Sequence, residues 1–161
     1  MTIHWCGTGL SAVPGLRKLI GEGRPLVVWN RSPEKAQAAV GDLTRDIRAF
    51  DADALAEALA PGDVVVSMLP GDWHVPLAER AIAKGAHFVS SSYISPEMRA
   101  LDAAAKEAGV ALVNEVGLDP GIDHLMAHRL MADYRASDAF DPANELSFLS
   151  YCGGVPKQAN A

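Results

Sequence analysis

Carboxylates, glycines and a histidine gather in one short segment past the middle of the sequence, Asn114-Glu115-Val116-Gly117-Leu118-Asp119-Pro120-Gly121-Ile122-Asp123-His124. The segment follows an apolar run and precedes a helical pattern, which predicts that it connects a strand to a helix. Asp119 is its best-placed carboxylate to hold a substrate ammonium group or to polarise an imine. Asp119 is also predicted to cap the start of the helix, because Asp before Pro is favoured at that position, and this structural role is compatible with the chemical one.

Two more ionisable side chains of this segment, Glu115 and His124, have either a catalytic or a structural role. A histidine titrates near neutral pH, so His124 is able to carry a proton during a reaction. The sequence nevertheless favours a histidine packed within the fold. Asp123 falls in the first turn of the predicted helix, where a negative charge is stabilised by the helix dipole.

A glycine-rich motif opens the chain, with Gly7-Thr8-Gly9-Leu10-Ser11-Ala12 matching G-x-G-x-x-A. Gly7 allows a tight turn, Gly9 lets the backbone approach a pyrophosphate, and Ala12 allows close packing of a helix on a strand. The motif follows a strand-like run and precedes a helical pattern, so the N–H groups at the helix start face the phosphates. This context predicts dinucleotide binding; the alternative is a glycine turn that binds nothing.

The end of the second strand-like run bears on which dinucleotide is bound. Chains that bind NAD usually carry Asp or Glu there for the ribose 2′-hydroxyl, whereas this sequence has Asn30-Arg31-Ser32. The guanidinium of Arg31 is a fork of donors suited to a 2′-phosphate. We therefore expect NADP in preference to NAD. A solvated arginine at the end of a strand is the alternative for Arg31.

The next two strand-like runs also end in residues suited to ligand contacts, at the sheet edge where ligands collect in such folds. Ser67 and Leu69 end the first of them, and both are predicted to contact the cofactor. His74 either approaches the nicotinamide or, as the sequence favours, caps the next helix or lies at the surface. The second run ends at Ser90-Ser91-Ser92-Tyr93, whose hydroxyls suit polar ligand contacts, and Ser95 is a helix cap.

Apolar runs alternate with helical patterns along the chain. The predicted strands cover residues 3–6, 26–29, 64–69, 88–91 and 111–113, and the predicted helices cover 10–20, 33–40, 53–59, 76–84, 96–108 and a last segment that starts at 119–121. Strands that are apolar throughout and separated by helices indicate a parallel sheet covered on both faces. The fold class is therefore α/β, a doubly wound sheet of the Rossmann type.

The C-terminal part differs from this alternation. Residues 137–144 indicate a turn or linker, and residues 145–151 alternate apolar and polar side chains like a strand. We expect a dinucleotide-binding domain over 1–136. Residues 137–161 are expected to be a linker and the first strand of a substrate or dimerisation domain that the chain does not contain, so that the chain is a fragment.

Composition excludes several classes of protein. The 161 residues are 49% hydrophobic and 21% charged with a net charge of −6, which is typical of a globular protein and argues against a nucleic-acid surface. No apolar run approaches the about 20 residues of a membrane helix. Met1 to Cys6 lack the regions of a signal peptide, so we expect a cytoplasmic protein. Cys6 and Cys152 have no metal-type spacing, and reduced thiols with no metal are expected.

Taken together, five motifs resemble the saccharopine dehydrogenase family, especially its glutamate-forming branch. They are Gly7 to Ala12, Asn30-Arg31-Ser32, Ser91-Ser92-Tyr93-Ile94-Ser95-Pro96, Asn114 to His124, and Ser150-Tyr151-Cys152-Gly153-Gly154-Val155-Pro156. The resemblance implies oxidation of saccharopine to glutamate and aminoadipate semialdehyde, or the reverse, in lysine metabolism. It also implies a homodimer when full length, with dimer contacts and much of the substrate site in a larger second domain. That domain is absent, so we expect these residues alone to be inactive.

The resemblance also implies roles for individual residues. Thr8, Gly9, Leu10 and Ser11 would line the pyrophosphate, while Asn30, Arg31 and Ser32 would hold the adenosine ribose and its 2′-phosphate. Ser92, Tyr93 and Asp119 would contact the amino-acid substrate, and Leu118 to Pro120 would border the nicotinamide.

Two other functions remain open. One is a nucleotide-binding module or subunit without catalysis; the other is a related imine reductase acting on a polyamine or another amino-acid conjugate.

Overall fold

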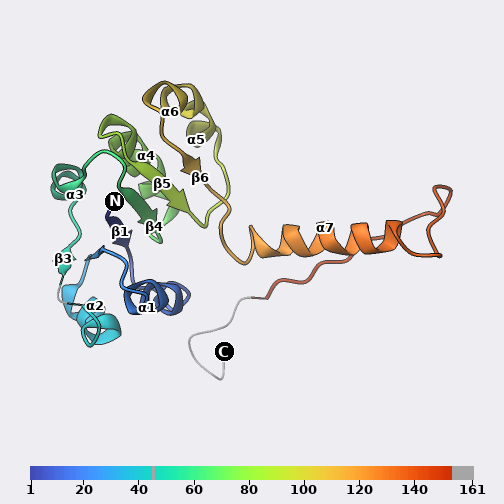
Figure 1. Ribbon diagram of the computed structural model, residues 1–161, viewed down its shortest axis with the longest axis horizontal. Helices are drawn as coiled ribbons and strands as arrows, with labels where there is room; N and C mark the ends of the chain where they lie inside the picture. The colour runs from blue at the N-terminus through green and yellow to red at the C-terminus, as the bar shows by residue number, and fades with distance from the viewer. Residues whose placement is uncertain (45, 154–161) are drawn as a thin grey trace.

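Six parallel strands form one sheet in the order β3-β2-β1-β4-β5-β6, shown in Figure 1, a computed structural model that describes residues 1–44 and 46–153. The strands are β1 (Ile3–Cys6), β2 (Leu26–Asn30), β3 (Ile47–Ala49), β4 (Val64–Ser67), β5 (His87–Ser90) and β6 (Leu112–Val113). The helices are α1 (Val13–Gly21), α2 (Pro33–Val40), α3 (Ala52–Ala58), α4 (His74–Ala83), α5 (Pro96–Ala100), α6 (Asp102–Ala108) and α7 (Ile122–Arg135), with a 3-10 turn η1 at Gly71–Trp73. The predicted doubly wound α/β fold is confirmed.

Helices cover the sheet on both faces because its strands carry apolar side chains on both. On one face, Leu16 of α1 and Val40 of α2 pack against β1 and β2. On the other face, Leu55 of α3, Leu77 of α4 and Met98 of α5 pack against strand residues that include Phe88. The carboxyl ends of all six strands therefore meet at one edge, and the site is built from the loops that leave that edge.

The sequence predicted five of the strands and missed the sixth. The edge strand β3 has only three residues, and the side chains of its last two are exposed. So short and exposed a strand has neither an apolar run nor a regular alternation to mark it. The helix predicted from Pro96 to Ala108 is interrupted at Leu101, which separates α5 from α6.

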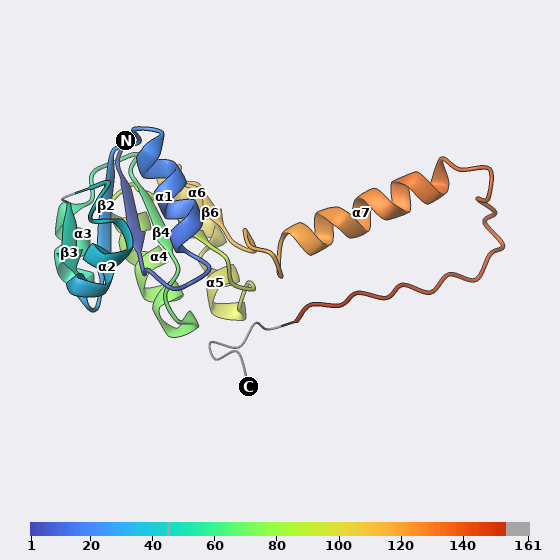
Figure 2. The ribbon, with the colours of Figure 1, turned by 90° about the horizontal axis from the view of Figure 1, so that it is seen from below.

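The C-terminal part departs most from expectation. Helix α7 buries none of its residues, and Figures 1 and 2 show it projecting from the rest of the molecule, followed by an extended segment that turns back toward the sheet. The strand predicted over 145–151 was wrong, because these residues pair with no strand in the part of the chain that the structure describes. Gly154 to Ala161, including the end of the Gly-Gly-Val-Pro motif, lie outside the described residues. Within residues 1–44 and 46–153, no helix is both long and apolar enough to cross a membrane.

Candidate functional site

The glycine motif forms the predicted turn after β1. Gly7 has φ +103°, and a Cβ on it would lie 2.9 Å from the carbonyl oxygen of Met68 at the end of β4. Only glycine fits so close to another strand in this conformation. By contrast, a Cβ on Gly9 would have nothing within 4 Å, so Gly9 faces open space. Ala12 is 2% exposed and packs in the core beside Trp5 and Leu16, as the motif predicted.

Helix α1 begins three residues later than predicted, and this leaves a row of free backbone donors. Residues 10–12 form a turn, and the helix starts at Val13 with Pro14 in its first turn. The N–H groups of Thr8, Gly9, Leu10 and Ser11 donate no hydrogen bond to any residue that the structure describes. Adjacent free N–H groups before a helix are the usual donors to a phosphate, so this turn fits a pyrophosphate.

The turn after β2 places Arg31 at the same edge. The side-chain amide of Asn30 donates to the carbonyl of Ser32 over 2.8 Å, which holds the turn between β2 and α2. Ser32 is the N-cap of α2, but its hydroxyl does not bond to the helix backbone. The Arg31 side chain is exposed. All three predicted residues therefore lie at the edge beside the glycine turn, since Gly7 donates its N–H to the carbonyl of Trp29 over 2.8 Å.

A buried histidine links the ends of β4 and β5. His74, 6% exposed, lies between two serines, with Nδ1 at 3.0 Å from Ser67 Oγ and Nε2 at 2.8 Å from Ser92 Oγ. Desolvation lowers the pKa of His74, which favours the neutral imidazole. The prediction of a capping or surface histidine was wrong, because a buried polar residue whose two ring nitrogens both have a hydroxyl partner is satisfied inside the fold.

Ser67 and Leu69, the two predicted cofactor contacts at the end of β4, lie in different surroundings. Ser67 is fully buried, and its hydroxyl is engaged with His74, so the side chain serves the fold. Leu69 is half-buried and adjoins Gly7.

A tight turn before α7 presents Asp119. The Gly117 N–H donates to the carbonyl of Pro120 over 2.9 Å, and the Asp119–Pro120 peptide is cis. The N-cap of α7 is Gly121, not Asp119, so the predicted cap was wrong. Asp123 instead accepts from the Gly121 N–H over 2.7 Å. Asp119 is thus free to point away from the helix backbone.

Tyr93 orients the Asp119 carboxylate. Its hydroxyl donates to Asp119 Oδ1 over 2.6 Å, and this hydrogen bond raises the pKa of Tyr93 to about 12. Both side chains are exposed, so a ligand has access to them. The structure therefore brings together two of the three predicted substrate contacts, and the third, Ser92, precedes Tyr93 in the chain.

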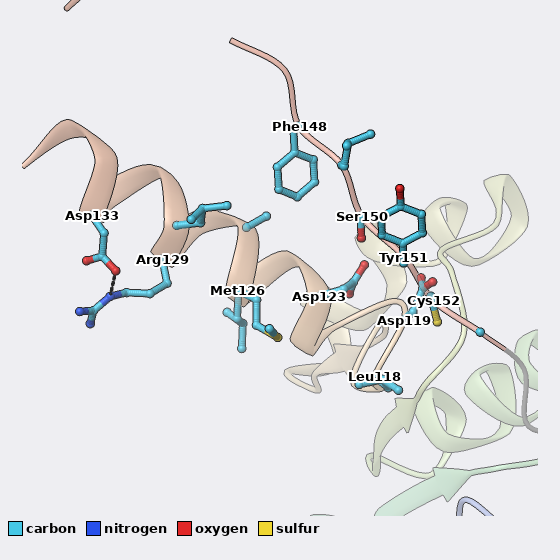
Figure 3. A pocket seen from close by; sticks show the side chains of 15 residues that line it. Leu118, Asp119, Asp123, Met126, Arg129, Asp133, Phe148, Ser150, Tyr151 and Cys152 are labelled. Atoms are coloured by element: carbon cyan, nitrogen blue, oxygen red, sulfur yellow. Dashed lines mark hydrogen bonds and ion pairs between the residues drawn. The ribbon is translucent and has the colours of Figure 1, made fainter. Parts of the chain in front are cut away.

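Cys152 also lies beside Asp119, and sequence analysis did not select it for the site. In Figure 3 its side chain lies next to that of Asp119, on the segment that returns from α7. The carboxylate raises the pKa of the Cys152 thiol, through a hydrogen bond first and through its charge as well. Its position in the Ser150-to-Pro156 motif was the available signal.

Two cavities meet at the turn that carries Asp119. A groove of about 590 Å³ runs from the start of α1, at Ser11 and Ala12, past Met68 to Leu118 and Asp119. A second cavity of about 750 Å³ lies between α7 and the returning segment, and Figure 3 shows Phe148 and Tyr151 along it. Leu118 and Asp119 line both cavities. The start of α1 and the acidic segment thus line one groove, and Asp119 faces both this groove and the cavity on α7.

The other ionisable residues of the acidic segment have structural partners. Glu115 Oε1 accepts from the N–H of Ile94 over 3.2 Å and so ties its loop to the loop after β5. The His124 side chain is 60% exposed and pairs with Asp123 at 3.0 Å, so the prediction of a packed histidine was wrong. Helix α7 buries none of its residues, which explains this error. Across residues 1–44 and 46–153, no cluster of three or more His, Cys, Asp or Glu could hold a metal ion.

Comparison with known families adds a match over most of the fold. The family model described as "Saccharopine dehydrogenase NADP binding domain" matches residues 4–113, which run from β1 to β6.

Individual relatives extend the likeness beyond that match. The chain is 38% identical to the NADP(+), L-glutamate-forming saccharopine dehydrogenase of Pyricularia oryzae over 93% of this chain and 33% of that protein. For the enzyme with the same description from Saccharomyces cerevisiae, the identity is 37% over 93% of this chain and 34% of that protein. The chain therefore spans about a third of the length of these relatives.

A solved structure supports the same relationship. The apo saccharopine dehydrogenase (L-Glu forming) from Saccharomyces cerevisiae superposes with a TM-score of 0.74 at 33% identity, covering 84% of this chain and 31% of that one.

Proposed function

Because this chain belongs to the saccharopine dehydrogenase family, through a domain described there as NADP-binding, we propose that it is the NADP-binding part of an oxidoreductase acting on the secondary amine of saccharopine. The observation that carries the proposal is the position of Asp119, which lines both the groove from the glycine turn and the cavity on α7. A carboxylate between a dinucleotide site and an open cavity suits a cationic substrate nitrogen.

The residues present fit a dinucleotide phosphate. The free N–H groups of residues 8–11 would hold the pyrophosphate, and Gly9 leaves the space that it needs. Arg31 would hold the 2′-phosphate, and Ser32, whose hydroxyl makes no capping bond to α2, follows it in the chain. The bound nicotinamide would supply the redox chemistry, by accepting or giving a hydride.

The reaction requires a defined movement of atoms. Oxidation of saccharopine removes a hydride from the carbon beside the secondary amine and a proton from the nitrogen, which leaves an imine. Water adds to the imine carbon, and cleavage of the C–N bond then releases glutamate and aminoadipate semialdehyde. Asp119 would stabilise the positive charge that the nitrogen carries as substrate amine and as protonated imine. Tyr93 would hold Asp119 in place through its hydroxyl.

Binding and turnover measured separately test this proposal. We expect the chain to bind NADPH, detected by fluorescence, and to bind saccharopine when NADPH is present, a pair that does not react. NADPH oxidation with glutamate and aminoadipate semialdehyde tests turnover. NADPH binding without saccharopine binding would favour a nucleotide-binding module, because the chain spans only about a third of the length of its relatives. Oxidation with a polyamine conjugate instead would favour a related imine reductase.

Arg31→Ala is expected to weaken NADPH binding by about tenfold or more while leaving NADH binding unchanged, because only NADPH carries the 2′-phosphate that a charge-assisted hydrogen bond would hold. Dissociation constants for both nucleotides, measured by fluorescence titration, check this. Arg24→Ala, which removes another exposed arginine at some distance along the chain, is the control. Equal affinity of the original chain for both nucleotides would contradict the preference for NADP.

A further inference from the structure

His74 holds a position that the proposed chemistry does not use. Its ring is buried between the last residue of β4, Ser67, and the loop that carries Ser92 and Tyr93. It also packs edge-on against Phe88, with the ring centroids 6.2 Å apart. A buried neutral imidazole has one nitrogen that donates and one that accepts, so its tautomer decides what each serine hydroxyl does.

The Ser67 hydroxyl selects the tautomer. Ser67 is fully buried, and within the described residues His74 Nδ1 is the only hydrogen-bond partner of its hydroxyl. If Nδ1 carried the proton, Ser67 would accept it and its own buried hydrogen would have no partner, at a cost in stability. If Nδ1 is unprotonated, Ser67 donates to it and both groups are satisfied. The satisfied arrangement places the proton of His74 on Nε2.

That proton determines the role of Ser92. With Nε2 protonated, His74 donates to Ser92 Oγ over 2.8 Å, so the hydroxyl hydrogen of Ser92 is not used by the histidine. Ser92 is only partly buried and lines a cavity of about 360 Å³ together with His74 and Tyr93. The neighbouring Ser90 does not need this hydrogen, because its hydroxyl donates to Asn114 Oδ1 over 3.0 Å.

We propose that His74 is a positioning residue, which fixes the Ser92 hydroxyl as a hydrogen-bond donor to an oxygen atom of the bound ligand. The inference rests on the proposed function for the identity of that ligand. Two oxygens have this chemistry, a carboxylate of the amino-acid substrate and the carboxamide of the nicotinamide. Tyr93 follows Ser92 in the chain and holds Asp119, so the loop presents a donor and an oriented carboxylate side by side.

The tautomer is tested directly by nitrogen NMR on the 161-residue chain with labelled histidine. The ring shifts of His74 are expected to report a proton on Nε2 and none on Nδ1. In Ser67→Ala the selection is lost, and averaged shifts of two tautomers are expected. Ser90→Ala is the matched control, because Ser90 is equally buried and pairs with Ser67 in register, yet its hydroxyl bonds to Asn114. A proton on Nδ1 in the original chain would overturn the inference.

Ligand binding tests the role. Ser67→Ala and His74→Phe are compared with His87→Phe, a half-buried histidine at the opposite end of β5. Three probes are titrated: 2′-phospho-ADP-ribose, NADPH, and saccharopine with NADPH present. His74→Phe removes the group that orients Ser92 and is expected to weaken binding by about three- to tenfold. Ser67→Ala leaves the competent tautomer about half populated and is expected to weaken binding by only about twofold. If only saccharopine binds more weakly, the oxygen that Ser92 contacts is the substrate carboxylate. If NADPH also binds more weakly, that oxygen belongs to the nicotinamide carboxamide. Binding of 2′-phospho-ADP-ribose, which has neither oxygen, is expected to stay unchanged.

The outcomes separate this inference from the proposed function. If the binding of all three probes weakens together in Ser67→Ala and His74→Phe, the histidine is only structural and the inference is wrong. Unchanged binding of NADPH and saccharopine in both variants would also overturn it. If the original chain binds no NADPH, the proposed function fails and the ligand assignment falls with it, whereas the NMR spectrum still decides the tautomer.

Discussion

Asp119→Asn is expected to weaken saccharopine binding by about ten- to a hundredfold while NADPH binding stays intact. A hydrogen bond to a charged group contributes about 1.5–3 kcal/mol, and Asn removes the charge while keeping the size of the side chain. Titration of saccharopine in the presence of NADPH measures the effect. Asp123→Asn is the matched control, because this neighbouring carboxylate accepts from Gly121 and His124, not from Tyr93.

The same variant has a second readout that needs no ligand. The Asp119 carboxylate raises the pKa of Tyr93 to about 12, so Asp119→Asn should return it toward the ordinary value of about 10. The folded state thus holds the Tyr93 proton more tightly than the unfolded chain does. The stabilisation is complete below about pH 10 and is lost as pH rises through about 12. Ultraviolet titration of the tyrosines checks this, and an unshifted Tyr93 would show that the hydrogen bond does not form in solution.

A pair of alanine substitutions in the glycine turn is expected to separate folding from cofactor binding. Gly9→Ala places a methyl group in open space, so the melting temperature should hold while NADPH affinity falls by at least about tenfold, because the methyl group occupies the approach of the pyrophosphate. Gly7→Ala instead meets the Met68 carbonyl at φ +103° and should lower stability by about 1–3 kcal/mol.

Thermal denaturation and NADPH titration of both variants check the pair. If Gly9→Ala binds NADPH as the original chain does, the pyrophosphate does not lie against this turn. If the melting temperature of Gly7→Ala equals that of the original chain, the close approach of Gly7 to β4 is relaxed in solution.

The parts of the fold that follow from local sequence were predictable. Each buried parallel strand is a short apolar run. The glycine turn is marked by Gly7, because a positive φ and a close approach of the backbone require glycine. Ser95 was predicted as a cap, and its hydroxyl accepts from the Met98 N–H over 3.1 Å. The strand β3 was missed because an edge strand with exposed side chains has little reason to be apolar.

The errors at the site arise where distant residues meet. Asp119-Pro120 has the composition of a helix start, but the turn closed by Gly117 shifts the cap to Gly121. His74 lies just before the helix predicted over 76–84, and only folding brings Ser67 and Ser92 to its two nitrogens. The alternation over 145–151 resembles a strand, but a strand also needs a neighbouring strand to pair with, and the alternation of side chains says nothing about that neighbour.

The order of the strands has a consequence for how the chain folds as it is synthesised. The strand β1 is made first, yet it lies in the middle of the sheet, between β2 and β4, and Ile3 pairs with Val64. Until β4 leaves the ribosome, one edge of β1 stays unpaired, with its apolar side chains only partly covered. A substitution in β4 should therefore prolong the exposure of β1 and promote aggregation during synthesis, even where the finished protein tolerates it.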